Sequence, residues 1–191
     1  MKINKALPVA LLFATVISCN NNSTTTADET SKDSTITTTD SGTTMTLDKK
    51  NFESTIDGKQ TDLYVLKNYN GMQAAITNYG GRLVSLMVPD KNGNMTDVVV
   101  GFKSVDDYVN STEPYFGATI GRYGKRIAKG KLSLDGKQYT LFTNNGANTL
   151  HGGKKGYQAV VWDANKLNDS TLELTYLSKD MEEGFPGNLN I

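Results

Sequence analysis

The sequence has little of several residue types, and each shortage excludes a class of protein. A single cysteine, Cys19, rules out an intramolecular disulfide. One cysteine and one histidine, His151, also argue against a zinc site, because such sites take several nitrogen or sulfur ligands. Lys and Arg number 20 and Asp and Glu number 20, so the basic excess of a nucleic-acid-binding protein is missing. We therefore expect no metal, no cofactor and no nucleic-acid partner.

The first residues have the pattern of an export signal. Lys2 and Lys5 precede the apolar run ALPVALLFATVI, which is too short to span a membrane as a helix. The run ends in VISC, which resembles the bacterial lipobox, where cleavage before the cysteine leaves it N-terminal and lipid-modified. This predicts a lipoprotein signal peptide over residues 1–18, lipidation of Cys19, and a protein anchored to a membrane of the cell envelope, on its periplasmic or surface side. An ordinary signal peptide with an incidental cysteine is the alternative.

Residues 19–46 are rich in Thr, Ser, Asp and Asn and almost free of large apolar side chains. Such a segment cannot bury enough apolar surface to offset the entropy cost of ordering. We predict a flexible tether here, which joins the anchor to a folded part over residues 47–191.

The folded part is predicted to be all-β, because turn signals separate short alternating runs. Asp57-Gly58, Asn92-Gly93, Asp135-Gly136 and Asn168-Asp169 each lie between two such runs, and Asp-Gly and Asn-Gly suit tight hairpins. The second hairpin is expected to pair residues 83–88 with residues 98–102. Only residues 104–111 could form a helical turn, since no long segment has helical periodicity.

Hairpins at this spacing predict an antiparallel β-sandwich. In TLELTYL, Leu172, Leu174 and Tyr176 should share one apolar face, which needs a second layer. Leu189 and Ile191 read as the start of a further strand, so we expect a truncated sandwich. Trp162 is expected in the core by strand alternation.

The stretch NNGANTLHGG, residues 144–153, contains the chain's one imidazole. His151 follows Asn148-Thr149-Leu150 and precedes two glycines, which we expect to leave space for a ligand near the backbone. A lone loop histidine is more often a solvated residue, and that alternative stays open from the residues alone. Glu182 and Glu183 are expected to be solvated at a turn.

Three stretches together resemble the aldose 1-epimerase (galactose mutarotase) family: NYGGRLVSLMVPDKNGNMTDVVVGF, GATIGRYGKRIAKGKLSLDGKQYTL and NTLHGGKKGYQAVVW. The final EEGFPGNL is similar to it as well, and the motifs occur in the family's order. The resemblance implies a large twisted β-sandwich with a sugar bound on one open sheet. It implies that Arg126 and His151 line the sugar site, with Lys125 where the family has an asparagine, and with Asn148 beside them.

The resemblance also implies a proton-donating second histidine and a late glutamate base, and neither family stretch is found in this sequence. The expected activity is interconversion of the α- and β-anomers of hexoses such as galactose or glucose, with His151 as a catalytic residue and no cofactor. A non-catalytic surface module that binds sugar, or an inactive fragment, is the alternative.

Overall fold

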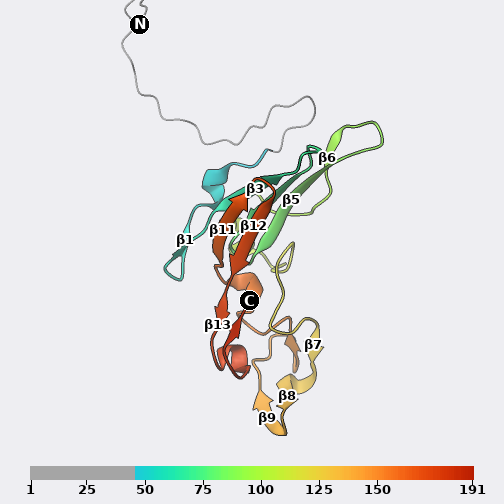
Figure 1. Ribbon diagram of the computed structural model, residues 1–191. Coiled ribbons are helices and arrows are strands. Elements are labelled where there is room, and N and C mark those ends of the chain that lie inside the picture. The colour runs from blue at the N-terminus through green and yellow to red at the C-terminus, as the bar shows by residue number, and fades with distance from the viewer. Residues whose placement is uncertain (1–45) are drawn as a thin grey trace, which may run out of the picture. The chain divides into compact units, whose positions relative to one another are not determined.

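The structure is a computed structural model that describes residues 46–191 (Figure 1). The predicted signal peptide, Cys19 and all of the predicted tether except Thr46 lie outside the described residues. Their assignments therefore stay predictions.

The described residues are mostly β, as the hairpin pattern predicts. The strands are β1 (Thr55–Ile56), β2 (Lys59–Gln60), β3 (Leu63–Lys67), β4 (Gln73–Thr77), β5 (Arg82–Pro89), β6 (Met95–Asp97), β7 (Arg126–Ile127), β8 (Lys131–Leu134), β9 (Lys137–Thr140), β10 (Thr149–Leu150), β11 (Asp163–Asn168), β12 (Thr171–Thr175), β13 (Leu177–Ser178) and β14 (Leu189–Asn190). The helical elements are the 3₁₀ turns η1 (Lys49–Phe52), η2 (Ala128–Gly130), η3 (Tyr157–Ala159) and η4 (Glu182–Gly184), and the α-helix α1 (Val105–Asn110). Every strand pair is antiparallel.

The largest sheet has the order β3-β4-β5-β6, and the other ten described strands form five two-stranded ladders. The β11–β12 hairpin lies beside this sheet (Figure 1) and is tied to it by the Lys67 amide, which donates to the Asp169 carbonyl. A bridge between Tyr79 and Val161 makes a second connection. The main core lies on one face of the four-stranded sheet, where Phe52 and Ala75 are fully buried.

Tight turns form at the predicted dipeptides. Asp57 and Gly58 have φ of 52° and 77°, and Asp135 and Gly136 have φ of 50° and 76°. Two consecutive positive φ angles give a turn whose twist matches the right-handed twist of the flanking strands. The predicted β1–β2 and β8–β9 hairpins are therefore confirmed, as is the β11–β12 hairpin.

The prediction for the partner of β5 is wrong in position. The strand paired with it is β6, not residues 98–102, which form no strand. The Asp90 carboxylate accepts hydrogen bonds from the amides of Asn92 and Asn94, so the turn closes early and the ladder starts at Met95. The Asp97 carboxylate then accepts from the Leu86 and Val99 amides, which ends the pairing.

Most other local predictions agree with the structure. Ser104 caps α1 by accepting from the Asp107 amide, as the expected helical turn requires. The expectation that no other segment forms a helical turn is wrong, because four 3₁₀ turns also form among the described residues. Trp162 is buried in a second cluster with Tyr157 and Val160. Leu172, Leu174 and Tyr176 are half-buried while their neighbours along the strand are exposed, which confirms the alternation. Within residues 46–191, no helix has the length and apolar character to cross a membrane.

Candidate functional site

The predicted site residues lie in and around one short ladder. In β7 and β10, Arg126 is opposite Leu150 and Ile127 is opposite Thr149. The ladder continues past the strand ends, because the His151 amide donates to the Lys125 carbonyl at 3.0 Å. The two segments that the sequence nominates, 25 residues apart, are thus neighbouring backbones. Arg126 is exposed and His151 is half-buried.

The imidazole of His151 is held by two contacts. The Lys125 backbone N–H donates to Nδ1 at 3.2 Å. The Tyr115 ring lies against it, with centroids 4.8 Å apart and an interplanar angle of 60°. Since Nδ1 accepts a hydrogen bond, the neutral imidazole carries its proton on Nε2. Within the described part of the chain, Nε2 has no hydrogen-bond partner, so this N–H is free to donate to a ligand oxygen.

The backbone at this contact is strained. Lys125 and His151, which face each other across the ladder, have φ of 70° and 53°. A left-handed conformation in a non-glycine residue costs on the order of 1–3 kcal/mol and persists only where the surroundings enforce it.

The two glycines after His151 do not leave space for a ligand, and that expectation is wrong. Both are buried. A Cβ on Gly152 would lie 1.6 Å from the Gly121 carbonyl oxygen, and one on Gly153 would lie 2.4 Å from Oε2 of Glu183. The protein itself fills these positions, and the glycines allow close packing of three segments behind the imidazole.

Asn144 clamps the loop that carries His151, a role that the sequence reasoning missed. Its Oδ1 accepts from the Leu150 amide at 2.6 Å. Its Nδ2 donates to the Leu150 carbonyl at 2.9 Å and to the Gly153 carbonyl at 2.8 Å. A longer contact of 3.4 Å reaches the Tyr115 hydroxyl. Burial raises the pKa of Tyr115, and the hydrogen bond from Asn144 opposes that shift.

The neighbouring asparagines fix the other nominated residues. Oδ1 of Asn145 accepts from Nε of Arg126 at 3.0 Å. Oδ1 of Asn148 accepts from the Lys129 amide at 3.1 Å, so this oxygen is used to shape the turn after β7. The side-chain nitrogen of Asn148 and the second lone pair of its oxygen are left for the sugar contact that the resemblance implies. The terminal guanidinium nitrogens of Arg126 make no hydrogen bond to another residue of the described segment.

The EEGFPG segment contacts the loop that carries His151. The expectation that Glu182 and Glu183 are solvated is wrong. Both are half-buried. The Glu183 carboxylate accepts from the Lys154 amide at 2.7 Å. The Glu182 carboxylate accepts from the Tyr176 hydroxyl at 2.5 Å and, through its other oxygen, from the Ser178 hydroxyl. Burial, followed by this bond to Glu182, raises the pKa of Tyr176.

Arg122 connects that segment to the GRY stretch. Its guanidinium donates to four acceptors near 3 Å: Oγ and the carbonyl of Ser178, and the carbonyls of Lys179 and Pro186. The side chain is therefore fully engaged in structure and is not available to a ligand. The sequence does not predict this structural role of Arg122, because GRY and EEGFPG are more than fifty residues apart.

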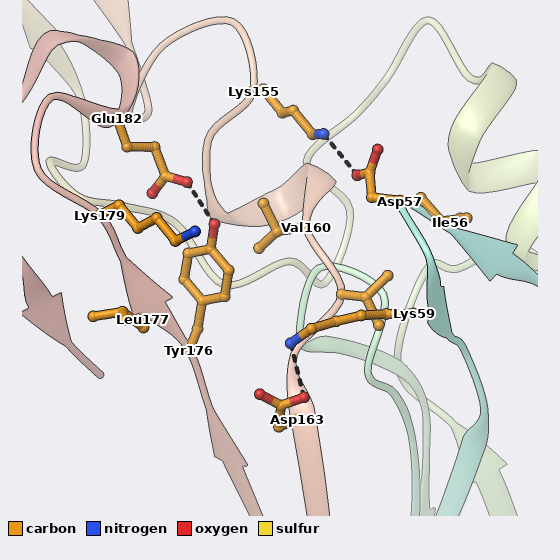
Figure 2. Close-up of a pocket in the computed structure, with 11 residues that line it drawn as sticks. Ile56, Asp57, Lys59, Lys155, Val160, Asp163, Tyr176, Leu177, Lys179 and Glu182 are labelled. Atoms are coloured by element: carbon orange, nitrogen blue, oxygen red, sulfur yellow. Dashed lines mark hydrogen bonds and ion pairs between the residues drawn. The ribbon is translucent and has the colours of Figure 1, made fainter.

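A separate cleft of about 530 Å³ lies between the β1–β2 hairpin and the segments that carry Val160, Asp163 and Tyr176 (Figure 2). Figure 2 shows Lys155 paired with Asp57 and Lys59 paired with Asp163, at 2.6 Å and 2.8 Å. Neither Arg126 nor His151 lines it. Among the described residues, no group of His, Cys, Asp and Glu could hold a metal ion.

The site therefore places an exposed guanidinium and a half-buried imidazole on neighbouring backbones of an antiparallel β protein, and each keeps N–H groups that bond to no other described residue. Comparison with known proteins agrees with this class. Residues 62–191 match the family model described as aldose 1-epimerase. Galactose mutarotase of Bos taurus is 43% identical over 120 residues, which cover 63% of this chain and 34% of that protein. Aldose 1-epimerase of Escherichia coli K12 is 35% identical over 133 residues, which cover 70% and 38%.

Solved structures agree in fold. An aldose epimerase homologue from C. elegans is matched with a TM-score of 0.64 at 32% identity, over 68% of this chain and 40% of that one. Galactose 1-epimerase from Lactobacillus acidophilus is matched with a TM-score of 0.62 at 28% identity, over 72% and 40%. This chain belongs to the aldose 1-epimerase family, and it has the mostly antiparallel β fold of the galactose mutarotases. It spans 34% to 40% of the length of these relatives.

Proposed function

We propose that the protein acts as an aldose 1-epimerase that interconverts the α- and β-anomers of a hexose such as galactose or glucose. Family membership supports the reaction class. The observation that carries the site is the pairing of the Lys125–Arg126 segment with His151, in which the Lys125 amide donates to Nδ1 and the Nε2 proton bonds to no other described residue. Arg126 would then donate hydrogen bonds to some of the sugar oxygens, and Nε2 of His151 would donate to a further sugar oxygen.

Mutarotation needs two proton-transfer groups. One must remove the proton of the anomeric hydroxyl while the other protonates the ring oxygen, and the roles then reverse. The 191 residues contain one histidine. Arg126 stays charged at neutral pH and cannot act as the second group. A carboxylate can also transfer protons, but neither family stretch that would carry the second histidine or the glutamate base is found in this sequence. We therefore propose that the 191-residue chain alone binds sugar without accelerating mutarotation.

The alternative function is a sugar-binding module without catalysis. The single imidazole favours it, because binding needs donors but no acid–base pair. The two functions predict the same ligand and differ only in turnover.

Polarimetry of freshly dissolved α-glucose measures turnover, and NMR of the His151 imidazole during a galactose titration measures binding. We expect no rate above the buffer background and a saturable change in the His151 signal. Arg126→Ala should weaken binding, and Lys91→Ala, at the exposed β5–β6 turn, should change nothing. A rate above background would overturn the proposal that the 191-residue chain lacks a second acid–base group. A His151 NMR signal that does not change as galactose is added would refute the proposed sugar site.

We further propose that Cys19 carries lipid and anchors the protein to a membrane of the cell envelope. The proposal rests on the VISC stretch after the apolar run. Expression with a labelled fatty acid tests it: label should enter the protein and disappear in Cys19→Ala. Label that persists in Cys19→Ala would refute lipidation at this residue.

A further inference from the structure

Two consecutive asparagines each hold one of the two residues assigned to the sugar. Asn144 bonds to the residues on both sides of the His151 turn, and Asn145 accepts from the Arg126 guanidinium. We propose that Asn144 and Asn145 are positioning residues that set the direction of the imidazole and the guanidinium together. This inference rests on the proposed function of His151 and Arg126, and neither asparagine is assigned a contact with the sugar.

The argument starts from the geometry of Asn144. A carboxamide has one acceptor oxygen and two donor hydrogens, and here all three are used on the same loop. The oxygen binds the Leu150 amide at 2.6 Å, and the nitrogen binds the carbonyls of Leu150 and Gly153 at 2.9 and 2.8 Å. The three bonds close the chain around His151, whose φ of 53° a free loop would not keep.

The same carboxamide extends to the ring that packs on the imidazole. Nδ2 of Asn144 lies 3.4 Å from the Tyr115 hydroxyl, and the Tyr115 ring lies 4.8 Å from the His151 ring. Both Nδ2 hydrogens already bond to carbonyls, so Asn144 acts on the backbone that carries the imidazole, and the Tyr115 hydroxyl is a long contact rather than a third full bond. The Lys125 N–H also donates to Nδ1 of His151, and this hydrogen bond can form only while Asn144 holds the loop in place.

Asn145 is fixed in the same short turn. Its amide and that of Asn144 donate to the Asn148 carbonyl, and the Asn148 amide donates back to the Asn145 carbonyl. The Oδ1 atom then holds Nε of Arg126 at 3.0 Å, which leaves the two terminal nitrogens of the guanidinium to face outward. Because the two asparagines are adjacent, a shift of this turn would displace both sugar-facing groups at once.

The test uses Asn144→Asp and Asn145→Ala in the 191-residue chain, with Asn165→Asp on the exposed face of β11 as the matched control. Aspartate has the shape of asparagine but cannot donate, and its charge would face two carbonyl oxygens. His151 is the only histidine, so its imidazole signals are unambiguous. Nitrogen-15 shifts report the tautomer, and the Cε1–H shift reports the Tyr115 ring.

We expect the free chain to show the proton on Nε2. In Asn144→Asp the tautomers should become mixed and the Cε1–H signal should move toward its unfolded value. Asn145→Ala should leave the imidazole unchanged and speed exchange of the Arg126 Nε–H. Asn165→Asp should change neither signal. An unchanged imidazole in Asn144→Asp, or an unchanged Arg126 signal in Asn145→Ala, would overturn the role of that asparagine.

A second measurement covers the case in which Asn144→Asp does not fold. In the unsubstituted chain, the Leu150 amide should exchange slowly with solvent, because the Asn144 oxygen holds it. Fast exchange of that amide would overturn the clamp. These measurements need no sugar, so they separate the two proposals. If the His151 imidazole has the expected tautomer but its signal does not change as galactose is added, the sugar site is refuted and the positioning role of Asn144 is not.

Discussion

Arg82 offers a demanding test of how this fold is held together, because its charge is buried without a carboxylate partner. Its side chain is only 1% exposed. The guanidinium donates to the carbonyls of Phe116, Pro114 and Gln158 at 3.0, 2.9 and 2.7 Å. It also lies over the Tyr108 ring, 4.7 Å from the centroid. Three backbone dipoles and an aromatic face thus replace the usual counter-ion.

The expected cost of removing this group follows from those contacts. A hydrogen bond to a charged group contributes about 1.5–3 kcal/mol, so three contribute roughly 4.5 kcal/mol at the lower value. Methionine in place of Arg82 loses these bonds but also removes the cost of burying a charge, which offsets part of the loss. We expect Arg82→Met to lower the free energy of unfolding by about 3 kcal/mol. Arg82→Lys should cost at least as much, because an ammonium keeps the charge but lacks the planar fork.

Urea unfolding followed by Trp162 fluorescence measures the change, since Trp162 is the one tryptophan and is buried. Lys91→Met at the exposed β5–β6 turn is the control and should stay within about 0.5 kcal/mol of the parent. If Arg82→Met also stayed within about 0.5 kcal/mol, the three bonds would not stabilise the fold. If Arg82→Lys matched the parent, charge rather than fork geometry would be the cause.

Three further outcomes are expected. Burial, followed by the bond to Glu182, raises the pKa of Tyr176, so the unfolded chain loses this proton first and stability should fall as pH rises above the ordinary tyrosine value of 10.0; Tyr176→Phe should flatten that fall in urea unfolding at pH 9 to 11, and an unchanged slope would show that Tyr176 does not contribute to it. Gly152→Ala should cost more than about 3 kcal/mol, since φ is 97° and the new Cβ would meet a backbone carbonyl; a thermal midpoint equal to that of the parent would contradict this. Asp57→Asn should change stability by less than about 1 kcal/mol, because both side chains of its pair with Lys155 are about half exposed; a larger loss that salt does not reduce would show that the pair is not solvent-screened.

The hairpins could be predicted from the sequence because their cause is local. Asp57-Gly58 and Asp135-Gly136 determine their own positive φ angles, and the flanking strands follow. The prediction that residues 98–102 pair with β5 is wrong for an equally local reason, which the pattern of apolar residues does not reveal. The Asp90 side chain tightens the turn, while the apolar run at residues 98–102 looks more strand-like than Met95–Asp97.

The site could be predicted only in part, because its residues depend on distant partners. His151 and Arg126 were found through motif resemblance, and the structure makes their backbones neighbours. The structural roles of Arg122 and Glu183 were missed, because their acceptors and donors lie tens of residues away. Asn144 was inside the motif, yet nothing in NNGANTLHGG shows that its side chain folds back onto the loop.

The strained pair at the centre of the site explains why so many polar contacts surround it. Lys125 and His151 both hold left-handed backbones, and each would relax if its loop were free. Asn144 holds the His151 loop by donating to the Gly153 carbonyl, and Glu183 holds it by accepting from the Lys154 amide. The Lys125 N–H can reach Nδ1 only while both hold. The direction of the Nε2 proton therefore depends on Asn144 and Glu183 as well as on His151, and substitution of either should alter it.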